Sequence, residues 1–148
     1  MKRFQFRLAR LFKVREIQEE IARGEWQAAE DLARRAEQRV HEILQLVAET
    51  NASLRELQAS EQLSSTEVLA LQDLLERVTR TLAGARRQAA ELRAAAERAR
   101  EPWTALRVEL EGLGRLEQRA RDAHRTELTR VENAELDQIA LERAARRA

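Results

Sequence analysis

The sequence feature that most limits the fold is an unbroken apolar seam between Val68 and Leu113. Apolar residues recur there at alternating steps of three and four, while Glu, Arg, Gln and Asp fill most positions between them. The seam residues are Val68, Leu71, Leu75, Val78, Leu82, Ala85, Ala89, Leu92, Ala96, Ala99, Trp103, Leu106, Leu110 and Leu113. Such a sustained 3-4 alternation is typical of a helix that supercoils with another helix. The seam predicts an all-α coiled coil and by itself indicates no chemistry.

The composition suits long helices and excludes several classes of protein. Charged residues make up 36% of the 148 residues and aromatic residues 3%, so the chain can bury one stripe per helix but no wide globular core. The absence of Cys excludes disulfides and a Cys nucleophile. No apolar run approaches the roughly 20 residues that span a bilayer, and the basic N-terminus lacks the apolar segment of a secretory signal.

We expect one coiled-coil domain over residues 1–148, built from two helical arms. Arm one should cover about 3–58, a turn and tip region about 59–84, and arm two about 85–145. Two long helices joined by a short turn form an antiparallel hairpin. The expected fold is therefore all-α, a long two-stranded antiparallel coiled-coil hairpin with a short helical tip region.

Local signals place the break and one irregularity. Serines cluster after Ala59, and Ser64 with Glu67 has the spacing of a capping box, so a new helix should start near Thr66. Pro102 removes a helical hydrogen bond, yet the seam passes through it in phase. We interpret Pro102 as a kink or brief break and not as a domain boundary.

The two arms differ in length, which motivates a binding hypothesis. If the chain ends pair, with Phe4 near Ala145, the seam from Val68 to about Ala89 has no partner in arm one. An exposed apolar stripe of this kind usually marks a binding site. The hypothesis is that the tip, at about 66–84, docks another protein.

No pattern in the sequence predicts catalysis. His41 and His124 fall far apart along the expected hairpin, so we expect ordinary solvated or rim positions for both. Carboxylates alternate with arginines at i, i+4 spacing, as in Glu30 and Arg34, which is typical of a solvated helix face. Phosphate-loop, dinucleotide, nucleophile-elbow and zinc-protease motifs are absent, and a bare hairpin offers no concave pocket. We expect no enzyme activity, no cofactor and no metal.

Positive charge is concentrated at the two ends of the chain. Residues 1–15 contain no acid and carry the bases Lys2, Arg3, Arg7, Arg10, Lys13 and Arg15. Residues 140–148 hold Arg143, Arg146 and Arg147 against Glu142, whereas acids outnumber bases between the two ends. In the expected hairpin the basic ends meet, so the rod would be positive at one end and apolar at the other.

Three interpretations of the N-terminus remain open. A helix would carry Phe4, Leu8 and Leu11 on one face and arginines on the other, which is typical of a membrane-surface helix, and Phe6 and Phe12 favour that option. The acidic middle of the chain and its few aromatic residues argue against a nucleic-acid contact. In the third interpretation, the apolar face seals the open end of the hairpin against the C-terminal helix.

Three stretches resemble the FliJ family, cytoplasmic components of the bacterial flagellar type III export apparatus. The opening Lys2-Arg3-Phe4-Gln5-Phe6-Arg7-Leu8-Ala9-Arg10-Leu11-Phe12-Lys13-Val14-Arg15-Glu16 resembles the start of FliJ proteins. The pattern Trp103-x6-Leu110-x2-Leu113-x2-Leu116-x2-Arg119 is similar to their second arm. The sequence Leu136-Asp137-Gln138-Ile139-Ala140 resembles their close. The similarity spans nearly the whole chain.

The resemblance implies a set of partners. The paired terminal helices would enter the pore of the hexameric export ATPase FliI like the central stalk of a rotary ATPase. The middle would contact the export gate FlhA, and the protein would help recycle export chaperones. The implied ATPase-ring contacts are Arg3, Phe4, Phe6, Arg7, Arg10, Leu11, Arg143, Arg146 and Arg147. The implied gate contacts are Leu71, Leu75, Val78 and Leu82, of which Leu82 departs from the histidine of some members.

From this resemblance we expect a largely monomeric hairpin in the cytoplasm. Its contacts with the export apparatus would hold it at the inner face of the membrane. ATP hydrolysis would bias the orientation of the rod or stabilise the ring, and the distal stripe would transmit this to the gate. Three other functions stay open. They are the equivalent stalk of a virulence type III secretion system, a dimeric coiled-coil spacer, and a peripheral membrane protein held by residues 1–15.

Overall fold

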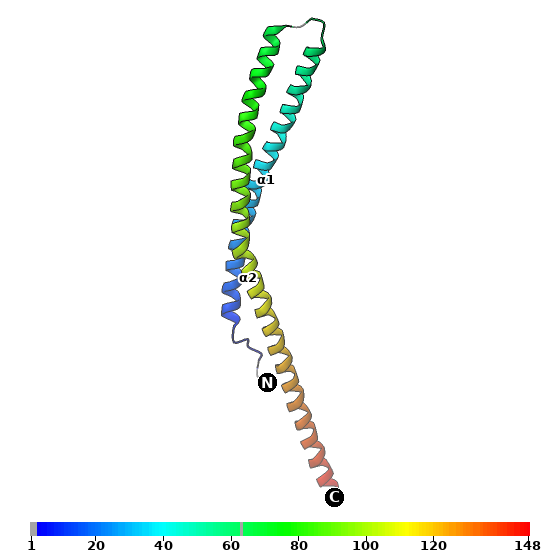
Figure 1. The fold of residues 1–148 in the computed structure, drawn as a ribbon. Coiled ribbons are helices and arrows are strands. Elements are labelled where there is room, and N and C mark those ends of the chain that lie inside the picture. The colour runs from blue at the N-terminus through cyan, green and yellow to red at the C-terminus, as the bar shows by residue number, and fades with distance from the viewer. Residues whose placement is uncertain (1–2, 63) are drawn as a thin grey trace. The chain divides into compact units, whose positions relative to one another are not determined.

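The fold consists of two long helices that pack against each other (Figure 1). The computed structural model describes residues 3–62 and 64–148. Helix α1 spans Ala9–Ala59 and helix α2 spans Ser65–Arg147, and the described residues contain no strand. This arrangement confirms the all-α helical hairpin that the seam predicted.

The connection between the helices lies where the serines predicted it. α1 ends at Ala59 and α2 begins at Ser65. The backbone N–H of Glu67 donates a hydrogen bond to the hydroxyl of Ser64 at 3.4 Å. Ser64 is therefore the N-cap that its spacing from Glu67 indicated, because its side chain pairs a backbone donor that the helix leaves without a partner.

The first helix starts later than predicted. Arm one was expected from about residue 3, but residues 3–6 are not helical, and a turn precedes α1, in which the Ala9 N–H donates to the Phe6 carbonyl at 3.2 Å. The first turn of α1 has no acidic residue. Arg7 and Arg10 instead place positive charge at the positive end of the helix dipole, which disfavours extension of the helix toward residue 3.

The chain divides into two compact units. Unit 1 comprises Met1–Glu20 and Thr104–Ala148, and unit 2 comprises Ile21–Trp103. Each unit holds a stretch of both helices. α2 remains helical through Pro102, so the brief break that the proline suggested does not occur.

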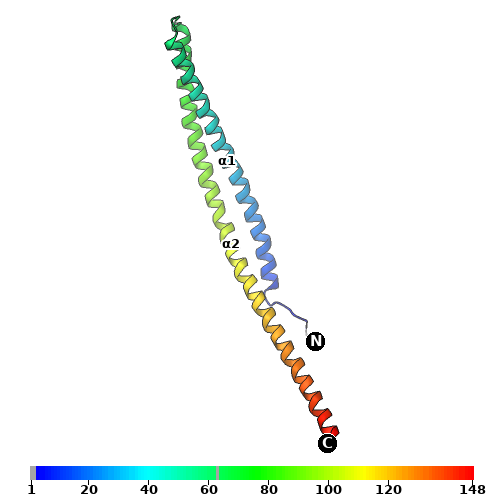
Figure 2. The same ribbon diagram turned by 90° about the vertical axis from the view of Figure 1, so that its right-hand side faces the viewer.

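In unit 2 the two helices lie side by side and are joined at one end by the turn (Figure 1, Figure 2). The buried cluster joins Ile43 of α1 to Val78, Leu82 and Ala85 of α2, with Val40 and Val47 packed against it. Further from the turn, Ala33 and Ala96 are fully buried. Small side chains at a helix–helix contact let the two backbones approach closely, so this seam is narrow and depends on alanine.

An ion-pair bridge fixes the relative register of the helices in unit 2. Arg93 of α2 donates to both carboxylate oxygens of Glu37, at 2.8 and 2.9 Å, and to Glu30 at 2.7 Å. The hydrogen bonds from Arg93 hold the pKa of Glu37 below its ordinary value, and both glutamates raise the pKa of Arg93. Two acids on α1 that converge on one guanidinium favour one alignment over a slipped one.

Two tryptophans stack at the other end of unit 2. The rings of Trp26 and Trp103 lie 4.6 Å apart between centroids and are nearly parallel, with an interplanar angle of 9°. Both side chains are half-buried. A shift of one helix by a heptad would separate the two rings and leave each without an aromatic partner. This pair therefore reinforces the register that Arg93 selects.

The register differs from the prediction that the chain ends pair. Val78 and Leu82 were expected to lack a partner in arm one, but each is 8% exposed and packs in the cluster around Ile43. In unit 1, Phe4 lies against His124 and not against Ala145. The helices pair outward from the turn, because closing a short loop costs less chain entropy than closing a long one.

Unit 1 contains the start of α1 and the last part of α2. Arg15 of α1 forms an ion pair with Glu109 of α2, with 2.8 Å between Nε and Oε2. Past the N-terminal segment, α2 continues alone (Figure 1, Figure 2). Every residue from 129 to 148 is exposed, so the unpartnered part of the chain is the end of α2 and not the tip. Among the described residues, neither helix is long and apolar enough to cross a membrane.

Candidate functional site

The non-helical N-terminal segment is held on α2 by Phe4. The Phe4 ring lies 5.6 Å from the His124 ring, and the guanidinium of Arg121 lies 5.1 Å from the centre of the same ring. The positive guanidinium is attracted to the face of the aromatic ring. Phe4 therefore packs the N-terminal segment against α2, as the third interpretation predicted for this residue. Leu11, from the same predicted face, stays 42% exposed.

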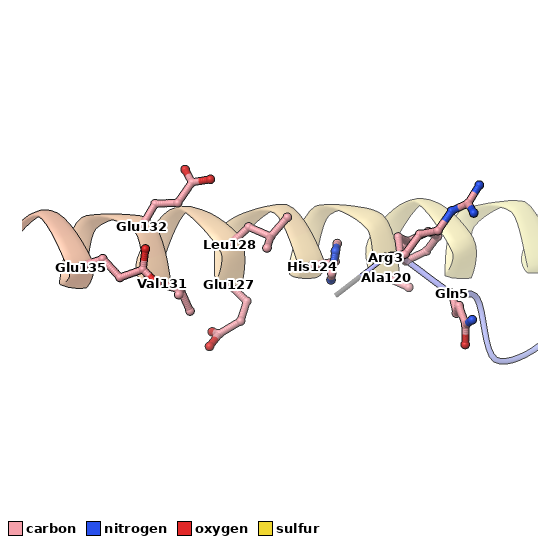
Figure 3. A pocket seen from close by; sticks show the side chains of 10 residues that line it. Arg3, Gln5, Ala120, His124, Glu127, Leu128, Val131, Glu132 and Glu135 are labelled. Atoms are coloured by element: carbon pink, nitrogen blue, oxygen red, sulfur yellow. The ribbon is translucent and has the colours of Figure 1, made fainter. Parts of the chain in front are cut away.

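A groove of about 750 Å³ runs along α2 beside this segment (Figure 3). Its lining combines apolar side chains with a row of acids. The lining residues are Arg3, Phe4, Gln5, Ala120, His124, Glu127, Leu128, Val131, Glu132 and Glu135. The expectation that the hairpin offers no concave pocket was therefore wrong, because it assumed that the chain ends pair and that arm one would cover the end of α2.

The polar groups of the groove are mainly carboxylates. Arg130 donates two hydrogen bonds to Glu127, at 2.9 and 3.1 Å, and these lower the pKa of the Glu127 carboxyl. Glu132 and Glu135 are exposed carboxylates on the same stretch of helix. Across the described part of the chain, no group of three or more His, Asp or Glu could hold a metal ion.

The structure does not bring the two basic ends together. Of the predicted ATPase contacts near the N-terminus, Arg3 and Phe4 line the groove. Arg3, Arg7 and Arg10 are exposed, and Phe4 and Phe6 are half-buried. The predicted contacts near the C-terminus, Arg143, Arg146 and Arg147, are exposed at the end of α2. Because Phe4 contacts His124, the two groups are separated by roughly 28 Å of helix at ~1.5 Å per residue. Their role in ring binding remains a prediction.

The predicted gate stripe is not exposed as expected. Leu71 and Leu75 are half-buried, and Val78 and Leu82 belong to the buried cluster. Leu69 is 65% exposed and Leu74 is 38% exposed on the same stretch of α2. The argument that this stripe lacks an intramolecular partner is wrong, so its contact with the gate remains a prediction from family resemblance alone.

Sequence reasoning missed the exposed apolar side chains at the end of α2. Leu136 is 63% exposed, Ile139 45% and Leu141 71%. Leu136 and Ile139 line a shallow hollow together with Arg143 and Arg147. The unequal arm lengths were the signal that could have found this surface, but the excess length was assigned to the tip.

A family model described as "Flagellar FliJ protein" matches residues 4–148. The chain belongs to the FliJ family. The resemblance of the opening, the second arm and the close is thereby confirmed, and this FliJ chain is a component of the flagellar type III export apparatus. The match favours the flagellar apparatus over a virulence secretion system. No curated protein and no solved structure matches the chain.

Proposed function

We propose that this FliJ chain is the stalk of the export ATPase FliI, with the end of α2 inserted into the hexameric ring. The observation that carries the proposal is the uncovered stretch of α2 at residues 129–148, which α1 leaves open on every side. A central stalk needs an uncovered segment of this kind, because the subunits of a surrounding ring must be able to contact it from every side. The stalk would work in the cytoplasm, at the inner face of the membrane where the apparatus assembles.

The chemistry of this helix end suits a protein ring. Leu136 and Ile139 supply exposed apolar anchors, and Arg143 and Arg147 follow them on the same hollowed face. Apolar anchors beside guanidinium groups are typical of protein interfaces, where Arg binds carboxylates with two hydrogen bonds. The ring surface that faces this end should therefore offer apolar and acidic side chains.

The basic N-terminal segment would form a second contact with the ring. Arg3, Arg7 and Arg10 are exposed in unit 1, and Arg3 lines the groove. Since they lie roughly 28 Å along α2 from Arg143, the two basic groups would touch the ring at two levels. Contacts at two levels would hold the helix upright in the pore, so that ATP hydrolysis in the ring could change the orientation of the stalk or stabilise the hexamer.

The stalk would also link the ring to the export gate FlhA and help recycle export chaperones. For the gate contact we retain Leu71 and Leu75, which are half-buried, and add the neighbouring exposed residue Leu74. Val78 and Leu82 would support this surface from the buried cluster and would not touch the gate directly. This assignment rests on the resemblance to FliJ proteins and on the exposure of the side chains.

The ATPase proposal is tested by reversing the charge of the α2 end. The wild-type chain should raise the ATP turnover of purified FliI and its hexamer fraction. The triple variant Arg143→Glu, Arg146→Glu and Arg147→Glu should bind at least ~10-fold more weakly, because attraction to acidic ring side chains becomes repulsion. Its melting temperature should stay within a few degrees of the wild type because all three side chains are exposed, and any loss of helix should be confined to the end of α2, where acids oppose the helix dipole.

A matched control reverses three exposed arginines of α2 in unit 2, Arg86→Glu, Arg87→Glu and Arg98→Glu. This control should stimulate the ATPase like the wild type. The stalk proposal fails if the wild type leaves turnover and hexamer formation unchanged, or if the C-terminal triple variant stimulates as well as the control.

A further inference from the structure

The start of α1 has a second apolar face that α2 does not cover. Leu11, Val14 and Ile17 are 42%, 49% and 52% exposed. Their i, i+3, i+6 spacing spreads them over about a third of the helix circumference. The exposed bases Arg7 and Arg10 precede them. A helix in a two-stranded coil normally has polar residues away from its partner, so this basic and apolar face indicates another contact.

The groove on α2 has the opposite character. Its apolar part comes from Phe4, Leu128 and Val131, and the acids Glu132 and Glu135 also belong to its lining. The groove extends the α2 face that contacts the N-terminal segment at His124, so it continues an existing helix interface. An amphipathic helix with positive charge fits this combination of shape and charge.

The α1 face of the same chain cannot enter this groove. Arg15 holds the start of α1 against Glu109, and Phe4 holds the preceding segment against His124. The face and the groove therefore lie at successive positions along α2 in one copy. A second copy, however, carries a free α1 face of matching chemistry.

We propose that two copies of this chain associate reciprocally, with the α1 face of each copy in the α2 groove of the other. Leu11, Val14 and Ile17 pack on the apolar part of the groove, and Arg7 and Arg10 lie against Glu132 and Glu135. Two-fold symmetry forms the same junction twice, which makes the surface self-complementary. The dimer buries Arg7 and Arg10, which the proposed function assigns to the ATPase ring, so dimerisation and ring binding through this segment exclude each other. The inference does not rest on that function.

Sedimentation equilibrium of the full chain tests the proposal, from micromolar to several hundred micromolar protein. The wild type should dimerise with a dissociation constant on the order of tens of micromolar, as small polar interfaces do, and high salt should weaken it. The variant Arg7→Glu with Arg10→Glu and the variant Glu132→Lys with Glu135→Lys should each stay monomeric. Both should fold, because acids at the start of α1 favour its dipole and the two glutamates are exposed.

Mixing the two variants gives the decisive result. In the mixed pair one junction carries both charge reversals and the other carries none, so both junctions are complementary and dimerisation should return. The control Arg115→Glu with Arg119→Glu, exposed on α2 outside the groove lining, should dimerise like the wild type. The proposal is overturned by a wild type that stays monomeric throughout, by variants that dimerise as well as the wild type, or by a mixture that remains monomeric.

Discussion

Replacing Leu82 with Asp is expected to unfold the hairpin of unit 2. Leu82 is 8% exposed and packs with Ile43, Val78 and Ala85 in the buried cluster. Losing its side chain should cost about 2–5 kcal/mol, and burying a carboxylate without a partner adds a similar amount. Because natural domains are stable by only about 5–15 kcal/mol, the sum removes most of the stability.

Far-UV circular dichroism measures this loss as a function of temperature. The Leu82→Asp variant should melt at least ~20 °C below the wild type or show no cooperative transition. Leu69→Asp is the matched control on the same helix, and it should melt within a few degrees of the wild type because Leu69 is 65% exposed. Equal melting temperatures for the two variants would mean that Leu82 is free of α1, which is the register that the unequal arm lengths first suggested.

The difference between buried and exposed leucines of α2 also decides which variants can test gate binding. A binding loss in Leu82→Asp would report unfolding, since Leu82 lies in the buried cluster. Substitutions at the exposed residue Leu74 change the surface and leave the cluster intact. Gate assays on this chain should therefore use Leu74 first.

The tryptophan stack gives the second large effect. Trp103→Ala should lower the free energy of unfolding by about 2–4 kcal/mol, toward the low end for aromatic truncation because the ring is half-buried. Trp26→Ala should cost a similar amount. Stacked rings 4.6 Å apart should also be coupled, so the double variant should be about 1 kcal/mol more stable than the sum of the single losses predicts.

Urea unfolding followed by circular dichroism measures all four proteins of this double-mutant cycle. Circular dichroism is needed because each single variant keeps only one of the two tryptophans and the double variant has none, so fluorescence cannot follow all four proteins alike. Strictly additive losses would show that Trp26 and Trp103 do not touch, and would contradict the register of unit 2.

Local features of the fold could be predicted from the sequence because they depend on neighbours along the chain. The seam predicted a supercoiling helix, the serines located the break, and the Ser64–Glu67 spacing predicted the N-cap that the structure contains. The i, i+4 pair of Glu30 and Arg34 also forms, with 3.3 Å between Oε1 and Nε. The break, the N-cap and the ion pair each need only a few consecutive residues, and the seam repeats one local pattern along a single helix.

The register could not be predicted from the periodicity of the seam. Sliding one arm by a heptad again places apolar residues opposite apolar residues, so many alignments satisfy the pattern equally well. The alignment is selected by single contacts, chiefly Arg93 with Glu37 and the stack of Trp26 on Trp103. The short turn is a further constraint, because it keeps the end of α1 at Ala59 close to the start of α2 at Ser65.

The groove was not predicted for the same reason, the assumption that the two chain ends pair. A prediction that paired Phe4 with Ala145 covered the end of α2 and left no hollow. With Phe4 placed on His124, the α2 stretch past it loses its cover, and the acids Glu132 and Glu135 become the wall of a groove. The non-helical start of the chain could not be predicted from apolar spacing, because its apolar residues also fit a helix. The spacing does not reflect the repulsion between its arginines and the helix dipole.

The central claim is that the helices pair outward from the turn and leave the end of α2 free for partners. Because the chain has no Cys, spin labels can be placed at two engineered cysteines and their separation measured by pulsed electron paramagnetic resonance. Labels at Gln5 and Arg125 should lie within ~20 Å, whereas labels at Gln5 and Arg146 should lie more than ~30 Å apart, given ~1.5 Å of helix per residue. A short distance between Gln5 and Arg146, with a long one between Gln5 and Arg125, would contradict the account.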